Sequence, residues 1–229
     1  KDGGYLIPKK SLESTTILYS FGLEADWSFE EDFYHLTKSK IYCYDHTVNW
    51  KFFLKLFLGN PKTILKFFQY KFFFDNKDKF HIRKMICPTK SYSPSLNENS
   101  LADLDSIIKT TVDKKNFFKI DIEGHEYRIL DQIKKYSSSM NGLAIEFHNC
   151  DLHSDKIKNF INNFELQLVH IHVNNWALVN SDNSPRVIEL IFSTKDFNKK
   201  ITNFQKKFPI SMDVPNNPLY EDLSIEFND

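Results

Sequence analysis

Acidic and imidazole side chains gather near the middle of the chain, where FFKIDIEGHEYRIL runs from residue 117 to residue 130. An apolar, β-rich run predicts a buried strand here, and Asp121, Glu123 and His125 follow close behind it. Carboxylates and imidazole can orient a partner, hold a cation or move a proton. The plain alternative is that Asp121 and Glu123 only cap the helix that begins at Gly124.

Two later segments end in the same kinds of side chain. Glu146 and His148 close the segment GLAIEFH, and His170, His172 and Asn174 lie near the end of LQLVHIHVNN. Because successive side chains of a strand point to opposite faces, residues two apart share a face. Three neighbouring strands could therefore aim acid, imidazole and amide groups into one crevice. Taken singly, a histidine near a strand end is more often a hydrogen-bonded structural residue.

The segments that must position these residues alternate between strand-like and helix-like patterns. Such alternation is typical of a βαβ chain with a parallel sheet, whose ligands bind beyond the carboxyl ends of the strands. We expect strands at 15–22, 40–45, 79–88, 117–124, 142–148, 166–175 and 186–193. Helices are expected between the first six, and a short polar loop predicts that the last two form an antiparallel hairpin.

Asp45 ends the second expected strand, where an acid has a specific use in nucleoside-containing cofactor sites. A carboxylate at this position can accept both hydroxyl protons of a ribose. The first strand-to-helix turn lacks the G-x-G-x-x-G pattern that lets backbone approach a pyrophosphate, which argues against nicotinamide and flavin dehydrogenases. The alternative is that Asp45 merely terminates its strand.

Residues 46–80 depart from a minimal βαβ unit and are rich in Phe and Lys. A Gly-Asn-Pro break at 59–61 divides them into two expected amphipathic helices. Residues 51–90 hold ten Lys and Arg residues and only two Asp, so this is the local basic surface. The plain interpretation is a solvated lysine face over packed Phe rings. The functional interpretations are a lid or groove for an anionic acceptor, such as a nucleotide- or phosphate-bearing glycan, or a homodimer face.

Composition limits the classes of protein. The 229 residues are 41% hydrophobic, which suits a single domain over residues 1–229 with the Phe/Lys-rich insertion at about 46–80 inside it. Basic and acidic residues number 30 each, so no overall charge favours nucleic acid. Three scattered cysteines argue against a disulfide scaffold or a zinc site. Without a membrane-spanning run or a signal-peptide pattern, a cytoplasmic location is expected.

Taken in order, the motifs resemble the FkbM-type methyltransferases, S-adenosylmethionine-dependent enzymes of the class I, Rossmann-like fold. FFKIDIEGHEYRIL is similar to the Asp-x-Glu-Gly-x-Glu signature that ends the fourth strand of that family. Pieces similar to its sugar-modifying branch are DGGYLIP, LYSFGLEADWSFE, IYCYD, SLADLDSII and VPNNPLYEDLSIEF, in the right order. They frame nearly the whole chain and leave only the Phe/Lys insertion outside. The resemblance implies an α/β fold with a seven-stranded, mostly parallel sheet, an antiparallel last strand and helices on both faces.

The resemblance also implies cofactor contacts. Gly22 and its neighbours would hold the methionine part of S-adenosylmethionine, Asp45 would bind the ribose, and Asp121 would lie near the sulfonium. The first loop of a methyltransferase usually carries several glycines, whereas FGLEADWSFE carries one. Other side chains must then supply the remaining contacts, and the candidates are Ser20, Asp26, Ser28 and Glu30.

Methyl transfer to an alcohol requires alignment of oxygen, methyl and sulfur, and removal of the hydroxyl proton. A histidine with a pKa near neutrality suits that base. His148 and His172 are the candidates, with His125 as a third. Asp121 and Glu146 could orient the base, or join His148 and His172 around a divalent metal that acidifies the hydroxyl.

We therefore expect an O-methyltransferase that acts on a sugar or nucleotide-linked sugar in bacterial polysaccharide biosynthesis, of capsule or lipooligosaccharide. The acceptor follows from the resemblance alone. Another class stays open, a non-catalytic Rossmann-like module that grips a glycan or a protein partner with the Phe/Lys insertion. A nucleic-acid surface is the weakest alternative, because the chain has no net charge and no RNA-binding motif.

Overall fold

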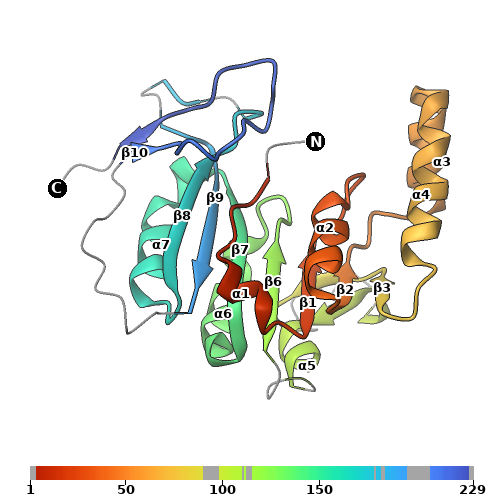
Figure 1. The fold of residues 1–229 in the computed structure, drawn as a ribbon, viewed down its shortest axis with the longest axis horizontal. Coiled ribbons are helices and arrows are strands. Elements are labelled where there is room, and N and C mark those ends of the chain that lie inside the picture. The colour runs from red at the N-terminus through yellow and green to blue at the C-terminus, as the bar shows by residue number, and fades with distance from the viewer. Residues whose placement is uncertain are drawn as a thin grey trace.

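The computed structural model describes residues 4–89, 98–109, 111, 115–177, 179–181, 184–194 and 207–226. A seven-stranded sheet with the order β3-β2-β1-β6-β7-β9-β8 forms its centre (Figure 1). The strands are β1 Ile17–Phe21, β2 Lys40–Tyr44, β3 Lys79–Ile82, β6 Asn116–Ile120, β7 Met140–His148, β8 Gln167–Val173 and β9 Val187–Ser193.

Every neighbouring pair in this sheet is parallel except the two pairs made by β9. The chain inserts β9 between β7 and β8 and runs it antiparallel to both. This is the class I arrangement that the sequence predicts, and the prediction of the fold is confirmed. The central strands β1 and β6 are buried at all five positions, as expected for a parallel sheet that helices cover on both faces.

Helices pack on both faces over two hydrophobic cores. One core joins alternate strand residues such as Tyr19, Phe118 and Ile145 to α5, α6 and α7. The other joins Leu18 and Phe117 to α2 and to the inner sides of α3 and α4. The helices are α1 Lys9–Glu13, α2 Ser28–Thr37, α3 Trp50–Gly59, α4 Ile64–Phe74, α5 Leu104–Ile108, α6 Leu130–Lys135 and α7 Cys150–Asn163. The 3-10 turns are η1 Pro61–Thr63, η3 Glu98–Ser100, η4 Glu126–Arg128 and η5 Ser137–Ser139.

The single strand expected over residues 79–88 is wrong, because the chain breaks after Ile82. A tight turn in which the Lys84 N–H donates to the Ile82 carbonyl ends β3. The chain then leaves the main sheet and forms β4 Met85–Cys87, which pairs in parallel with β5 Leu101–Asp103. Because residues 101–103 form β5, α5 begins only at Leu104, with the Asp103 side chain as its N-cap.

The Phe/Lys-rich segment forms two helices, α3 and α4, where the sequence predicts them. The Asn49 side chain caps α3 by accepting from the Lys51 and Phe52 N–H groups. The helices stand side by side at one end of the sheet and project beyond it (Figure 1). Their inner sides are aromatic: the rings of Phe53 on α3 and Tyr70 on α4 lie 5.0 Å apart.

A segment at the C-terminal end of the described chain lies over the ends of β8 and β9 (Figure 1). It is bounded by β10 Lys207–Phe208 and β11 Ile225–Glu226, which pair with each other in antiparallel fashion. Its Asn217 N–H donates to the Asn175 side chain at 2.6 Å, and the Asn216 amide donates to Glu189 at 2.8 Å. No helix of the described residues has the length and apolar character needed to cross a membrane.

Close packing of β7 against its neighbours gives a prediction for Gly142. A Cβ at this position would lie 2.5 Å from Cε2 of the buried Phe117 ring and 3.1 Å from the Phe192 carbonyl oxygen. We expect Gly142→Ala to lower the free energy of unfolding by about 1–3 kcal/mol, because overpacking forces buried groups to shift. Urea denaturation followed by circular dichroism measures this.

Gly59→Ala is the matched control, since no atom lies within 4 Å of a Cβ placed there. It should leave the denaturation midpoint unchanged or raise it slightly, because alanine is the better helix former. Equal midpoints for wild type and Gly142→Ala would contradict the prediction.

Candidate active site

A pocket opens at the carboxyl ends of three neighbouring strands. Gly22 follows β1, Asp45 follows β2 and Asp121 follows β6, and all three residues line it. The chain leaves β1 for β2 on one side, while β6 lies on the other side of β1. This is the switch point of the sheet, where open parallel sheets bind their ligands.

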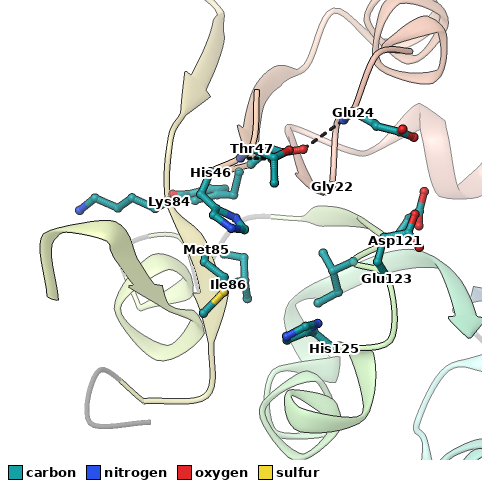
Figure 2. A pocket seen from close by; sticks show the side chains of 13 residues that line it. Gly22, Glu24, His46, Thr47, Lys84, Met85, Ile86, Asp121, Glu123 and His125 are labelled. Carbon is teal, nitrogen blue, oxygen red and sulfur yellow. Dashed lines mark hydrogen bonds between the residues drawn. The ribbon is translucent and has the colours of Figure 1, made fainter. Parts of the chain in front are cut away.

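The pocket has two unlike sides (Figure 2). Glu24, Asp121 and Glu123 lie together on one side, and the other side includes His46, Met85 and Ile86. One side is therefore anionic and the other offers apolar contact. A ligand with a cationic part and a flat, weakly polar part suits this division.

Gly22 allows the first loop to touch the end of β6. Its φ of 87° lies in a region that favours glycine, and a Cβ would stand 1.6 Å from the Asp121 carbonyl oxygen. No side chain fits there, so backbone alone forms this wall of the pocket. A glycine at this turn thus has a steric reason, and its predicted contact with the cofactor stays a prediction.

Asp45 lines the pocket, but the chain already uses its carboxylate. Oδ2 accepts from the N–H groups of Leu23 and Glu24 at 2.9 and 3.1 Å, and Oδ1 accepts from the N–H and hydroxyl of Thr47 at 2.7 and 2.6 Å. Burial acts to raise the pKa of Asp45, and these four bonds outweigh it and lower the pKa. Because a carboxylate offers about four acceptor positions, Asp45 is mainly a clamp between the loops after β1 and β2.

Glu24 is a pocket acid that the sequence analysis missed. Burial raises its pKa, as do the charges of Glu123, Asp121 and Asp45. Glu24 is an exposed residue at the edge of the pocket, and no hydrogen bond to its carboxylate is found among the described residues. In the sequence, Glu24 is marked only by its place two residues after Gly22. An acid near a glycine is a common pattern and does not by itself indicate a binding residue.

Lys119 is a second residue that the sequence analysis passed over. Its buried ammonium group donates to the Gly22 carbonyl at 2.9 Å and lies 3.4 Å from Asp121 Oδ2. Burial acts to lower the pKa of Lys119, and the charges of Asp121, Glu30 and Glu146 outweigh it and raise the pKa. Lys119 therefore stays charged and ties the β1 loop to β6. A lysine inside the apolar run FFKI was the available signal.

Beside the pocket, three of the four predicted metal ligands come together. His148 Nε2 lies 3.4 Å from Glu146 Oε1 and 4.0 Å from Asp121 Oδ1. One ligand atom from each of these residues falls within 4.8 Å of the others. Burial and the charges of Asp121 and Glu189 raise the pKa of Glu146 to about 8. Glu146 is therefore largely protonated at neutral pH when only protein groups surround it.

Glu126, the second glutamate of Asp-x-Glu-Gly-x-Glu, fixes both the turn and the imidazole. Fully buried, its Oε1 accepts from the N–H groups of Ile122 and Gly124 at 3.1 Å and lies 3.1 Å from His148 Nδ1. Because a carboxylate has no proton to give, Nδ1 is the donor and Nε2 faces the cluster. In the sequence Glu126 is visible only as part of the motif, which does not predict its contact with His148.

The expected neutral pKa of the histidine base is wrong for His148. Burial acts to lower its pKa, but the hydrogen bond to Glu126 and the charges of Glu126, Glu146 and Asp121 outweigh burial and raise it to about 9. His148 is thus an imidazolium at neutral pH when only protein groups surround it. In that state Nε2 has no lone pair with which to take a proton.

His172 does not join the cluster. Its Nδ1 lies 3.2 Å from Glu189 Oε2 and its Nε2 lies 2.8 Å from Asp222 Oδ2, in a buried site under the C-terminal segment. These contacts outweigh burial and raise its pKa to about 9. Glu189 of β9 stands in register between Glu146 and His172, so the antiparallel strand separates the two acid and imidazole groups that were expected in one crevice.

The other predicted residues divide between the pocket and the core. His125 lines the pocket. Ser20 donates to Glu30, and both are buried behind the first loop. Asp26 accepts from the Ser28 N–H at 2.9 Å. Ser20, Asp26, Ser28 and Glu30 are not among the residues that line this pocket in the described part of the chain.

No family model and no curated protein matches the sequence. The chain is similar to an rRNA methylase from Streptococcus thermophilus, with 13% identity, a TM-score of 0.42 and coverage of 82% of this chain and 92% of that chain. It is also similar to a protein from Streptococcus mutans described as a methyltransferase and solved with SAH, with 15% identity, a TM-score of 0.42 and coverage of 80% and 92%.

A third similar structure comes from Streptococcus pneumoniae and is described as a tRNA (m1A22) methyltransferase in complex with S-adenosyl-L-methionine. It shares 11% identity, with a TM-score of 0.45 and coverage of 86% of this chain and 77% of that chain. The class I, Rossmann-like fold of this protein rests on its own strand order and on the position of β9, and not on these likenesses. Membership of the FkbM family stays a prediction.

The contact between Glu126 and His148 predicts a change in titration. Glu126→Gln keeps an acceptor for the turn but removes the charge that raises the pKa of His148, so the imidazole should titrate clearly below about 9. Because the folded pKa lies above the unfolded value near 6.5, this pair stabilises the fold fully below that pH, and the effect fades as pH rises toward 9. NMR of the imidazole in metal-free buffer measures the titration.

Glu13→Gln is the control, because Glu13 lies on α1 and pairs with Lys9 at the surface. It should leave the titration of His148 unchanged. An unchanged midpoint in Glu126→Gln would mean that Glu126 does not set the charge of His148.

Proposed function

We propose that this protein is an S-adenosylmethionine-dependent methyltransferase that methylates a hydroxyl group of a sugar. The observation that carries the proposal is an acid-rich pocket at the switch point of a class I sheet, next to a cluster of Asp121, Glu146 and His148. The motif resemblance supports the same conclusion. The sugar acceptor and a role in polysaccharide biosynthesis rest on that resemblance.

The chemistry of the pocket fits S-adenosylmethionine better than a phosphate-bearing cofactor. The cofactor carries a sulfonium and an ammonium group, and the acidic side of the pocket is suited to cations. Met85, Ile86 and Ile122 offer apolar contact for a purine ring. A pyrophosphate would instead meet the carboxylates of Glu24, Asp121 and Glu123, which repel it.

Individual roles follow from the contacts. The Gly22 backbone and Asp121 hold the methionine part and lie near the sulfonium. Glu24 accepts the ribose hydroxyls, and Asp45 keeps the two loops in place around them. Ser20, Asp26, Ser28 and Glu30 act through the packing of the first loop and do not touch the cofactor.

A divalent metal ion held by Asp121, Glu146 and His148 completes the proposal. The donor set fits, because two carboxylates and an imidazole converge within the reach of one ion. Burial and neighbouring carboxylates raise the pKa of Glu146, and carboxylates around His148 raise its pKa against burial. A bound divalent cation would acidify the acceptor hydroxyl. Glu126 would hold Nδ1 of His148 and leave Nε2 free for the metal, the usual arrangement of carboxylate, histidine and metal.

A second pocket lies beside the cluster and suits the acceptor. Glu123, His148, Asn149 and Arg186 line it, and Glu123 also lines the first pocket. An acceptor in this second pocket would contact His148. Glu123 would stand between the acceptor and the cofactor pocket, since it lines both pockets. Arg186 adds a fixed positive charge that a nucleotide- or phosphate-linked sugar could use. In this proposal His172 is a structural residue, and His125 contacts the cofactor side only.

Cofactor binding is the first test. Isothermal titration with S-adenosylhomocysteine should show binding to the wild type, and Glu24→Gln should weaken it about tenfold, or 1.4 kcal/mol, through loss of a charged acceptor. Gly22→Ala should abolish binding, because a side chain collides with Asp121. Glu13→Gln on α1 is the control and should bind as the wild type does. A folded wild type that fails to bind would favour a non-catalytic module.

Metal dependence is tested separately. Titration of metal-free protein with Mn²⁺ should show one site that Glu146→Gln and His148→Ala each weaken by tenfold or more, because each removes a ligand. His35→Ala, on the exposed side of α2, should bind Mn²⁺ normally. Binding of S-adenosylhomocysteine without any Mn²⁺ site would remove the metal and leave the methyltransferase proposal standing.

A further inference from the structure

The hairpin of α3 and α4, residues 50–74, exposes an unusual amount of apolar surface. Eight of the eighteen large hydrophobic side chains that are exposed in the described structure lie in it. Trp50 is 62% exposed, Leu58 73% and Phe72 86%. Scattered exposed hydrophobic residues are normal on a monomer, whereas a concentration on one projecting element marks a contact surface.

These exposed side chains follow a regular helical pattern. On α3 the exposed residues Trp50, Leu54 and Leu58 recur every four positions, and on α4 Ile64, Phe68 and Phe72 do the same. Residues four apart lie on one face of a helix. Other faces of the same helices meet the body of the protein through buried Phe rings and through Lys66, which donates to the Ala25 carbonyl at 2.9 Å. Each helix therefore has an anchored side and an apolar stripe that is open to solvent.

The charge on the hairpin has one sign. Residues 50–74 contain five lysines and no acidic residue, although the whole chain has no net charge. Lys51, Lys55, Lys62 and Lys71 are exposed and alternate with the apolar stripe. Lysine stems can lie along apolar surface while their ammonium groups reach an anionic layer.

The turn between α3 and α4 lies at the end of the hairpin farthest from the sheet (Figure 1), and exposed apolar side chains flank it. Phe57 and Leu58 precede the turn, and Ile64 and Leu65 follow it. All four are exposed, with Lys62 between them. Exposed apolar side chains next to a lysine suit the boundary between an apolar layer and an anionic one.

We propose that the α3–α4 hairpin docks the protein on an anionic lipid bilayer and lies in the plane of its headgroups. Trp, Phe and Leu beside lysines are the composition of helices that bind at membrane interfaces. With 10 and 11 residues, the two helices are too short to span a bilayer and long enough to lie in its surface. A symmetric homodimer through the same face would bring lysines of like charge together, which favours the bilayer.

This inference goes beyond the proposed function and does not depend on it. It has a consequence for the pocket, because α3 starts three residues after Thr47, whose N–H and hydroxyl bind Asp45. A docked hairpin would hold the loop after β2 close to the bilayer. The pocket would then face acceptors that are gathered at that surface.

Vesicle co-sedimentation of the full chain tests the proposal. The protein should bind vesicles that contain phosphatidylglycerol at least tenfold more strongly than phosphatidylcholine vesicles, and added salt should weaken the binding, since lysines contribute. The double variant Leu58→Ser with Phe72→Ser should lower binding about tenfold or more. Lys55→Glu with Lys62→Glu should remove the preference for phosphatidylglycerol.

Matched controls separate the hairpin from general surface effects. Leu36→Ser with Leu152→Ser changes two side chains of similar exposure, 72% and 73%, on α2 and α7. Lys40→Glu with Lys158→Glu makes the same change of charge away from the hairpin. Both pairs should bind vesicles as the wild type does.

Trp50 supplies a readout that no indirect effect would produce. On binding, the fluorescence of Trp50 should shift to shorter wavelength and be quenched by brominated lipid, and Trp50→Phe should remove this change. Binding to anionic vesicles that is no stronger than to neutral ones would overturn the proposal. Self-association in sedimentation velocity that is lost in Leu58→Ser with Phe72→Ser would also overturn it and assign the face to a second copy of the chain.

Discussion

The buried carboxylate of Glu126 is the interaction on which the site depends. With one oxygen it holds the turn after β6 and faces Nδ1 of His148. The turn places Asp121 at the pocket, and the imidazole places Nε2 against Glu146. A buried carboxylate is costly unless it has donors, and the turn and the histidine supply the donors to Oε1. Local backbone geometry and the chemistry of the cluster are thus set by one group.

The acidic and imidazole side chains at the strand ends form two separate sites, because β9 lies between β7 and β8. In register, Glu189 stands between Glu146 on β7 and His172 on β8, so the polar row across the sheet splits into two sites. The C-terminal segment satisfies the outer site, since Asp222 binds His172 and Asn216 binds Glu189. The inner site brings Asp121, Glu146 and His148 together beside the pocket. Residues of similar type therefore have different surroundings on the outer and the inner strands.

The hairpin and the pocket share one loop. Asp45 clamps the loop after β1 to the loop that leads through Thr47 into α3. Any surface that orients the hairpin therefore also orients the mouth of the pocket. A mostly parallel sheet has helices on both faces, which leaves its carboxyl edge as the place where insertions can add a binding surface without disturbing the core. The Phe/Lys segment is such an addition.

Most strands of the main sheet, the two helices of the Phe/Lys segment and the antiparallel last pair could be predicted from the sequence alone, because hydrophobic period and turn chemistry are local. The sequence also placed acids and imidazoles at the carboxyl ends of the strands. Only the tertiary structure decided which of them meet. Glu126 reaches His148 and Asp222 reaches His172 across 22 and 50 residues. Likewise, the break after Ile82 depends on pairing with a strand at residues 101–103. Such contacts depend on how distant segments pair, and no local pattern encodes that pairing.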